Sequence, residues 1–217
     1  FDVMYERTYV NGEPMGMPRV IACHFQHRGR ALPAFRYDQG DGFDYFDEAG
    51  QSLRKAFLKA PVEFSRISSR YNLKRFHPIL QKTKAHYGTD YAAPKGTPII
   101  SVGDGVVSKS SYTKGNGKYV KIRHNNTYET QYLHMSRRAV SAGEHVKQGQ
   151  VIGYVGSTGL ATGPHVCFRF WKNGKQVDHL REEFPPSTPI MANQMDAFQA
   201  TVEKLSTAIS ELNIATK

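Results

Sequence analysis

The fold is decided by residues 98–133, which read PIISVGDGVVSKSSYTKGNGKYVKIRHNNTYETQYL. Short runs rich in Val, Ile and Tyr alternate there with turns of Gly, Asn and Asp, and similar runs follow at 150–154 and 165–171. Closely spaced short strands with turn signals between them are typical of an all-β sandwich or barrel. We therefore predict a mainly β, antiparallel sandwich or barrel-like domain over residues 61–189, which ends at the proline-rich run 185–189.

The segments on either side of this domain have a different character. Residues 1–60 contain short apolar runs at 19–25 and 34–37 between Gly, Asp and Asn turns, which predicts a small β-rich N-terminal domain. In residues 190–217, apolar side chains recur at three- and four-residue steps, as on one face of an amphipathic helix. This helix is expected to pack on the domain or on a neighbouring molecule. The residues on its apolar face are Met195, Phe198, Val202, Leu205, Ile209 and Leu212.

The chain is strongly basic, with a formal net charge of +10 and a pI of about 9.6. Such a charge favours polyanions, either nucleic acid or an anionic cell-wall or lipopolysaccharide surface. Lys and Arg are spread along the chain and accompany no recognised nucleic-acid motif, so we expect no nucleic-acid partner. The sequence contains no apolar run long enough to span a membrane.

The two cysteines, Cys23 and Cys167, are too few for a disulfide scaffold, and the sequence leaves open whether one bridge joins them. Cys23 lies in an apolar run and is expected to be a small buried hydrophobe. The sequence starts with Phe1 rather than Met, so we expect that a targeting segment has been removed or that the chain starts inside a longer protein.

Two segments carry metal-ligand side chains at suggestive spacings. In His86-Tyr-Gly-Thr-Asp90, Gly88 allows a tight bend that lets the imidazole and the carboxylate converge, and both groups are good zinc ligands. In the apolar run that starts with His165-Val-Cys167, strand periodicity puts His165 and Cys167 on one face, where they could complete a metal site. Taken alone, each segment has an alternative explanation: chance spacing for the first, and a half-buried histidine beside a core cysteine for the second.

Two further features indicate a groove. His134 ends the alternating run Gln131-Tyr-Leu-His134, where a side chain can lean into a groove; the alternative is a surface histidine. Small residues dominate the segment 156–163, and we predict that Gly159, Thr162 and Gly163 line a substrate groove in which an extended peptide approaches the backbone. The alternative for this segment is a purely structural loop.

Together these motifs resemble the lysostaphin-type, or LytM, peptidase family. The resemblance rests on the runs at 86–98, 103–107, 132–134, 149–153 and 156–165. The upstream runs at 52–57 and 64–69 look like those of the Gram-negative murein endopeptidases of that family. The resemblance implies a compact antiparallel β domain with a groove and one zinc ion.

The family's motifs assign roles to five side chains. Its HxxxD motif supplies two zinc ligands, which correspond to His86 and Asp90. Its HxH motif supplies a catalytic histidine and the third ligand, which correspond to His165 and Cys167, and a further catalytic histidine corresponds to His134.

Cys167 stands where the family has a histidine, and this is the one departure from the pattern. As a second negative ligand beside Asp90 it makes the site formally neutral, so we expect bound water to be acidified less than by two histidines and an aspartate. We still expect metal binding to be retained, because the other positions match and a cysteine thiolate is a competent zinc ligand.

The resemblance implies a zinc-dependent endopeptidase that hydrolyses the peptide cross-links of bacterial peptidoglycan. The Gram-negative likeness favours the bond between D-alanine and meso-diaminopimelate, and it implies a periplasmic or envelope-associated, exported protein. The alternative is a non-catalytic envelope protein that keeps the fold and activates a cell-wall amidase. The sequence leaves open the oligomeric state, and whether the N-terminal domain regulates access to the groove or binds glycan.

Overall fold

The computed structural model describes residues 1–215 except positions 41, 64 and 78–81, and it leaves undescribed the side chains at 75–84 and 212–215. Phe64 of the upstream run and the side chain of Leu212 therefore lie outside the described residues. The chain divides into two compact units. Unit 1 comprises residues 1–56 and 184–217, and unit 2 comprises residues 57–183.

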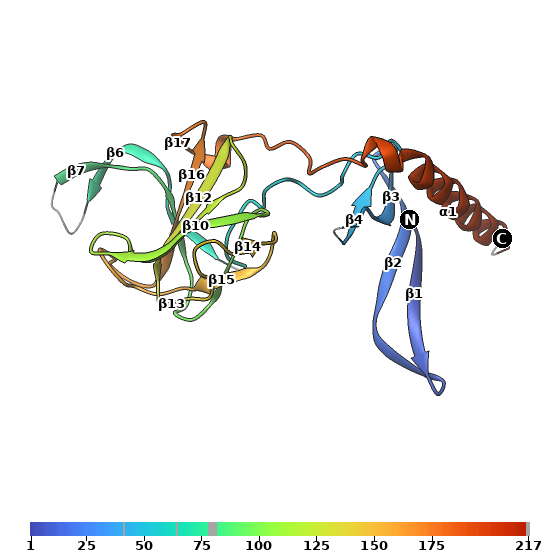
Figure 1. Cartoon of the computed structure of the whole chain (residues 1–217), viewed down its shortest axis with the longest axis horizontal. Coiled ribbons are helices and arrows are strands. Elements are labelled where there is room, and N and C mark those ends of the chain that lie inside the picture. Colours follow the sequence, from blue (N-terminus) through green and yellow to red (C-terminus); the bar gives the residue numbers. More distant parts are fainter. Residues whose placement is uncertain (41, 64, 78–81, 216–217) are drawn as a thin grey trace. The chain divides into compact units, whose positions relative to one another are not determined.

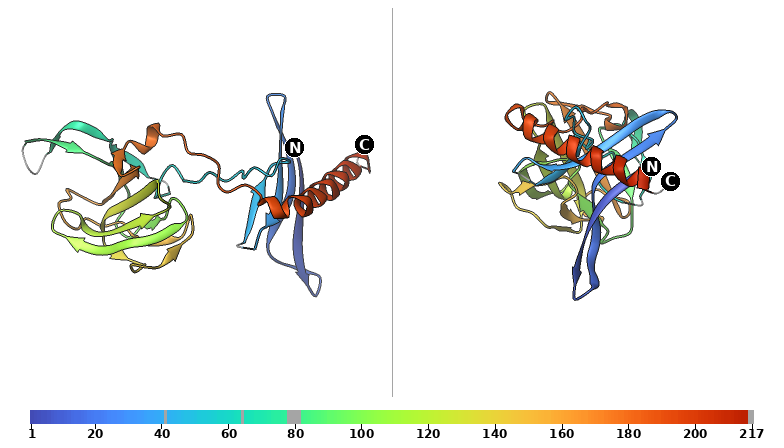
Figure 2. Two further views of the ribbon diagram at one scale, coloured as in Figure 1. Left: turned by 45° about the horizontal axis from the view of Figure 1, so that its top comes forward. Right: turned by 90° about the vertical axis from the view of Figure 1, so that its right-hand side faces the viewer.

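Unit 1 is an antiparallel sheet with a helix packed on it (Figure 1). Its strands lie in the order β1-β2-β3-β4, and the hairpin of β1 and β2 extends beyond the rest of the sheet (Figure 2). The elements are β1 (Asp2–Val10), β2 (Glu13–His27), β3 (Arg30–Asp38), β4 (Phe43–Phe46), the short 3₁₀ helix η2 (Ala192–Gln194) and α1 (Met195–Ala215).

Helix α1 packs on this sheet through the apolar face that the sequence predicts. Phe198 is fully buried and meets Tyr37 and Phe46 edge to face, with ring centroids 5.4 Å and 5.9 Å apart. Met195, Val202, Leu205 and Ile209 belong to the same core. Residues 190–217, which the sequence separates from residues 1–60, thus form one compact unit with the N-terminal strands. No helix among the described residues is long and apolar enough to span a membrane.

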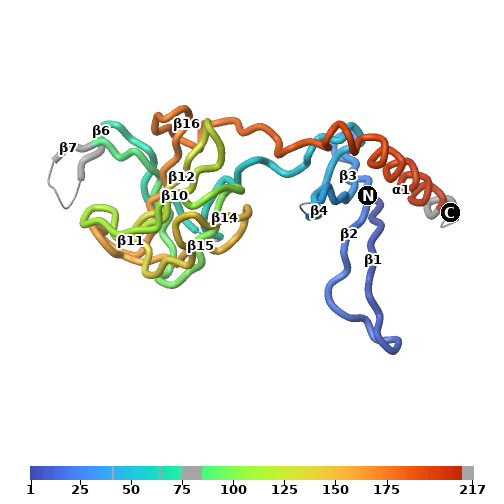
Figure 3. Tube along the Cα trace, in the orientation of Figure 1, coloured from blue at the N-terminus to red at the C-terminus, as the bar shows by residue number. Residues whose placement is uncertain are grey.

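Where the chain leaves unit 1 and where it returns to it, residues 54–56 and 185–187 lie side by side (Figure 3). Lys55 pairs with Pro186, and the amide of Ala56 donates to the carbonyl of Pro185 at 3.2 Å. The chain therefore leaves unit 1 and returns to it at adjacent points. Cys23, in β2, is only partly buried, which corrects the expectation of a buried hydrophobe, and both cysteines are free thiols.

Unit 2 is built almost entirely from antiparallel strands, which confirms the mainly β prediction. Among the described residues its largest sheet follows the order β14-β10-β11-β12-β16-β8-β5, with β17 paired to β16. A second sheet has the order β13-β15-β9, and β6 pairs with β7 as a separate hairpin. The elements are β5 (Arg66–Ser69), β6 (Asn72–His77), β7 (Lys82–His86), β8 (Thr89–Ala92), β9 (Pro98–Ile100), β10 (Gly105–Thr113), β11 (Gly117–Arg123), β12 (Tyr128–Met135), β13 (Arg137–Arg138), β14 (His145–Val146), β15 (Val151–Tyr154), β16 (His165–Lys172), β17 (Lys175–Val177) and the 3₁₀ helix η1 (His179–Arg181).

Strand β16 lies at the centre of the main sheet, between β12 and β8. On one face its side chains Val166, Phe168 and Phe170 are buried in the core, whereas on the other face Cys167 is buried and its neighbours are only partly buried. Tyr132 on β12 is fully buried, and its hydroxyl accepts from the amide of Val102 at 3.0 Å, which satisfies the polar end of the ring. The apolar residues that alternate in the sequence thus pack into a core around β16, the strand that carries the predicted ligand Cys167.

A buried polar pair lies beneath this strand. The Nε2 atom of His179 is 2.8 Å from the Tyr91 hydroxyl, which also lies 3.1 Å from the carbonyl of Lys59. His179 is buried and packs edge to face on Phe168, with ring centroids 4.7 Å apart. Burial lowers the pKa of His179 to about 4, although Asp178 opposes the shift. The folded chain therefore holds this imidazole neutral.

Unit 2 should lose stability on acidification through His179. The unfolded chain protonates this imidazole below its ordinary pKa near 6.5, whereas the folded chain does so only near 4, so stability is greatest above pH 6.5 and falls between those values. By linkage, His179→Gln should remove about 2 kcal/mol of the loss between pH 7.5 and pH 5. The measurement is urea unfolding of the metal-free chain, followed by the fluorescence of Trp171, the only tryptophan. His145→Gln, at an exposed position on β14, is the control; an equal loss of stability in the His179 variant and the wild type would contradict the prediction.

Candidate metal centre

The structure brings the three predicted ligands together on one face of the main sheet. Asp90 on β8 pairs directly with Cys167 on β16, and His86 stands at the end of β7. The Nε2 atom of His86 is 3.0 Å from Oδ1 of Asp90 and 3.5 Å from Sγ of Cys167. The ligand atoms of the three residues all lie within 4.8 Å of one another. These side chains therefore converge on one point, as a single cation requires.

Gly88 makes this convergence sterically feasible. A Cβ atom on Gly88 would lie 2.8 Å from the carbonyl oxygen of Phe168 and 3.0 Å from Sγ of Cys167. The turn between His86 and Asp90 thus packs directly on β16, at a separation that only glycine permits.

Backbone carbonyls orient the three histidines of the site. The Nδ1 atom of His86 is 3.0 Å from the carbonyl of Arg70, that of His134 is 2.8 Å from the carbonyl of Thr158, and that of His165 is 2.9 Å from the carbonyl of Gly163. Because a carbonyl only accepts, the hydrogen-bond pattern assigns the proton to Nδ1 in each ring. In the neutral form each ring then presents the lone pair of Nε2.

The two predicted catalytic histidines stand beside the ligands. The Nε2 atom of His165 is 3.9 Å from Oδ1 of Asp90, and the rings of His134 and His165 have centroids 4.8 Å apart. His134 has a positive φ of 63°, a backbone conformation that costs energy for a residue other than glycine. Burial lowers the pKa of His134 to about 4, so this imidazole is neutral near pH 7.

The electrostatics of the ligand cluster differ from one donor to the next. Burial raises the pKa of Asp90, but the hydrogen bond and charge of His86, with the charge of His165, bring it down to about 2. Burial raises the pKa of the Cys167 thiol, and the negative charge of Asp90 raises it further. Without a cation the cluster therefore holds an ionised carboxylate and a neutral thiol.

The donor atoms fit a divalent cation. Because its Nδ1 atom is bonded to the carbonyl of Arg70, His86 can donate to the carboxylate of Asp90, 3.0 Å away, only when it also carries a proton on Nε2; without that proton the two facing atoms are both acceptors. Two acceptors at that distance need a proton or a cation between them. Imidazole nitrogen, carboxylate oxygen and cysteine sulfur together form a donor set that suits zinc. The residues present thus fit the metal that the sequence motifs indicate.

Comparison with known proteins agrees with this geometry. Residues 84–179, which contain all the predicted metal-ligand, catalytic and substrate-binding residues, match the model of peptidase family M23. The chain carries an M23 peptidase domain.

Relatives of the M23 domain include named peptidoglycan enzymes. The chain is 44% identical over 204 residues to the peptidoglycan DD-endopeptidase ShyC of Vibrio cholerae, covering 94% of this chain and 47% of ShyC. It is 36% identical over 206 residues to ShyA of the same organism, also a peptidoglycan DD-endopeptidase, covering 94% of this chain and 47% of ShyA. A crystal structure of a zinc-containing peptidase from Vibrio cholerae aligns with a TM-score of 0.58 and 34% identity, covering 84% of this chain and 56% of that one. The chain spans about half the length of the curated relatives it matches.

The predicted substrate-binding residues lie on the loop of the M23 domain between β15 and β16. Gly159 and Thr162 are exposed, and the carbonyl of Gly163 holds the ring of His165. A Cβ atom on Gly159 would lie 2.3 Å from the amide nitrogen of Gly117, so this glycine also packs on β11. The loop thus supports the ring of His165, a predicted catalytic histidine, and has exposed residues beside it.

Sequence reasoning missed the groups that orient the imidazoles. The carbonyls of Arg70 and Thr158 carry no side-chain signature, since every residue has a carbonyl. Gly117 was visible in the sequence as a turn residue of Lys114-Gly-Asn-Gly117. Its contact with Thr158, however, arises only when β11 and the loop after β15 are brought together.

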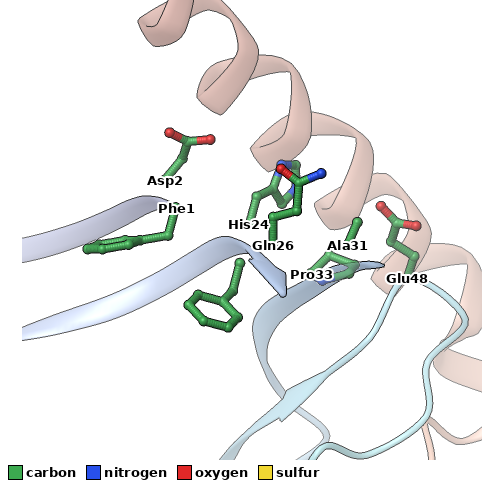
Figure 4. A pocket seen from close by; sticks show the side chains of 8 residues that line it. Phe1, Asp2, His24, Gln26, Ala31, Pro33 and Glu48 are labelled. Carbon is green, nitrogen blue, oxygen red and sulfur yellow. The ribbon is translucent and has the colours of Figure 1, made fainter. Parts of the chain in front are cut away.

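A separate pocket of about 220 Å³ lies in unit 1 (Figure 4). It is lined by Phe1, Asp2, His24, Phe25, Gln26, Ala31, Pro33 and Glu48. It contains none of the predicted site residues, so we assign it no part in the chemistry of the M23 domain.

Replacing Gly117 by alanine should change the orientation of the His134 ring indirectly, through the Thr158 carbonyl that holds this ring. Gly117 has a φ of 64°, and a Cβ there would lie 2.2 Å from the Thr158 carbonyl that holds the His134 ring. We expect Gly117→Ala to lower the free energy of unfolding by about 2–3 kcal/mol, through strain and backbone displacement. The histidine NMR signals of His134 should shift as well. Gly115→Ala is the matched control, because a Cβ there meets nothing within 4 Å; equal behaviour of the two variants would refute the steric argument.

Proposed function

We propose that this chain is the catalytic part of a zinc-dependent endopeptidase that hydrolyses peptide cross-links of bacterial peptidoglycan. The observation that carries the proposal is the convergence of His86, Asp90 and Cys167 beside two imidazoles that present Nε2. The names of ShyC and ShyA as peptidoglycan DD-endopeptidases support the substrate class. The bond we favour joins D-alanine to meso-diaminopimelate, because the upstream runs at 52–57 and 64–69 resemble those of the Gram-negative murein endopeptidases.

His86, Asp90 and Cys167 would hold the zinc ion. A bound zinc ion with three protein ligands supplies an activated water and polarises the scissile carbonyl. The sequence of this domain provides no glutamate base next to the ligands, unlike metalloproteases with an HExxH motif. The proton acceptor must therefore be one of the histidines.

His134 and His165 are both suited to proton transfer. Each ring is fixed by a backbone carbonyl through Nδ1, so each presents Nε2 for acceptance of a proton. Burial keeps His134 neutral at the pH at which hydrolysis would run. After one ring accepts the proton, the imidazolium can stabilise the developing oxyanion or protonate the leaving amine.

The charge of the chain suits a wall polymer as a partner. A formal net charge of +10 favours attachment to anionic cell-wall or envelope surfaces. We propose that the protein acts in the periplasm or at the cell envelope, where such a substrate is found. The alternative, a non-catalytic activator of an amidase, needs no converged ligand set and no carbonyl-oriented histidines, and the geometry therefore supports the enzyme.

Hydrolysis should depend on the metal and on His165. We expect the purified chain to convert cross-linked muropeptide dimers to monomers in the presence of zinc, and a chelator to abolish this conversion. His165→Ala should reduce the rate about 10²–10⁴-fold while zinc stays bound, because the variant loses a proton-transfer group and no ligand. The products are identified by mass spectrometry and zinc by elemental analysis, with the exposed His145→Ala as control. Dimer cleavage by His165→Ala at the wild-type rate would remove His165 from the mechanism.

Unlike His165, His86 should be needed for zinc binding as well as for hydrolysis. His86→Ala removes a ligand, so we expect at least about a hundredfold loss of zinc affinity together with loss of hydrolysis. Equilibrium dialysis against a competing chelator measures the affinity, and circular dichroism verifies the fold. Full zinc binding by this variant would show that the ion is held elsewhere.

A further inference from the structure

Arg169 lies next to the sulfur of Cys167 on the same face of β16. Strand periodicity puts residues 165, 167 and 169 on that face. A Cβ atom on Gly88 would lie 3.0 Å from Cγ of Arg169 and 3.0 Å from Sγ of Cys167, so the stem of Arg169 and the sulfur pack side by side on Gly88.

The guanidinium of Arg169 has an unusual environment. Its Nε atom is buried and has no hydrogen-bond partner among the described residues. In the same part of the chain no ion pair joins Arg169 to a carboxylate, whereas Lys172 on the same strand pairs with Glu182 at 2.7 Å. Among the described residues Arg169 thus has no carboxylate partner of its own, while its stem packs beside the sulfur of the ligand cluster. The positive charge of Arg169 therefore has to be included in the total charge of the metal centre.

The charges of the centre can be summed for each ligand set. A divalent cation with one aspartate and two neutral histidines carries one net positive charge. Replacement of one histidine by a cysteine thiolate makes the sum zero, and it weakens the attraction of the cation for an oxyanion or another anion. One adjacent guanidinium restores one net positive charge.

We propose that Arg169 compensates the negative charge of the Cys167 thiolate, so that the metal centre keeps the electrostatic attraction for anions that a histidine ligand would give it. This inference rests on the metal site of the proposed function and deepens it. Arg169 acts in it through charge and position: it is a positioning residue, and Cys167 and Arg169 work as a pair.

The test measures anion affinity in place of turnover. The full chain is loaded with Co²⁺, and azide binding is followed by the visible spectrum for the wild type, Arg169→Gln, Arg169→Lys, Cys167→His and the double variant Cys167→His/Arg169→Gln. We expect Arg169→Gln to weaken azide binding roughly tenfold or more, and Arg169→Lys to stay within about threefold of the wild type, because the lysine keeps the charge. Lys175→Gln, which removes an exposed positive charge on the neighbouring β17, is the matched control and should change the affinity by less than about twofold.

The double variant distinguishes charge compensation from the other roles of an arginine. Because its total charge equals that of the wild type, it should bind azide within about threefold of the wild type. If Arg169 contacted the anion directly or only supported the fold, the loss in Arg169→Gln would persist in the double variant. That result, or wild-type affinity of Arg169→Gln itself, would overturn the inference.

The remaining outcomes are also decisive. If Cys167→His fails to hold cobalt, the comparison of Arg169→Gln with Arg169→Lys decides in the native ligand set. A wild-type chain that shows no sulfur-to-cobalt charge-transfer band would overturn the proposed metal site as well. Bound cobalt with azide affinity indifferent to residue 169 would overturn this inference alone.

Discussion

The antiparallel pairing of β8 with β16 places Asp90 directly opposite Cys167, and the rest of the site depends on this register. In such a pair, residues opposite each other share a face, and their neighbours point to the other face. The neighbouring pairs, Thr89 with Phe168 and Tyr91 with Val166, are buried in the core. A slip of one residue would exchange the faces and expose apolar side chains whose burial stabilises the fold by about 1.5–3 kcal/mol each. These four core residues thus fix the position of the predicted ligands, although none of the four is itself a predicted ligand.

Once the register is set, the backbone completes the site. The imidazoles of His134 and His165 are each held by a carbonyl of the loop between β15 and β16. That loop approaches β11 closely because Gly117 and Gly159 meet without side chains. Hydrogen bonds to carbonyls fix the tautomer of both imidazoles without adding an ionisable group to the site. The charge of the site therefore depends on the ligands and the substrate. The positive φ of His134 is accommodated where this packing over-determines the local conformation.

Features that depend on residues close together in the sequence could be predicted, whereas features that depend on contacts between distant residues could not. Strand periodicity from 98 to 171 predicts the β domain because each strand shows its own alternation, and the helix face is predicted by its own steps of three and four residues. The packing of α1 on β3 and β4 could not be predicted, since it joins residues about 150 positions apart and no local pattern encodes the partner. The pairing of β6 with β7, and the Arg70 carbonyl that orients His86, were likewise not predicted, because these two strands show no regular alternation of apolar and polar residues. Arg169 was visible from the same period of two that paired His165 with Cys167, but its significance appears only with its contact on Gly88.

The burial of Cys167 bears on which cation such a site would select. Cys167 is only 3% exposed and packs with Tyr119 and Leu133. Bulk oxidants therefore have little access to its sulfur, which should be less sensitive to oxidation than an exposed thiolate. The same burial disfavours the thiolate unless a positive charge is close, and a bound cation supplies that charge at the shortest distance. Metal binding therefore releases the thiol proton of Cys167. Loss of this proton is coupled to metal binding more strongly than it would be at an exposed cysteine. A soft sulfur donor held in this way favours zinc and similar ions over magnesium or calcium, which prefer oxygen. The departure from a histidine ligand thus sharpens the selectivity of the cluster for a thiophilic metal.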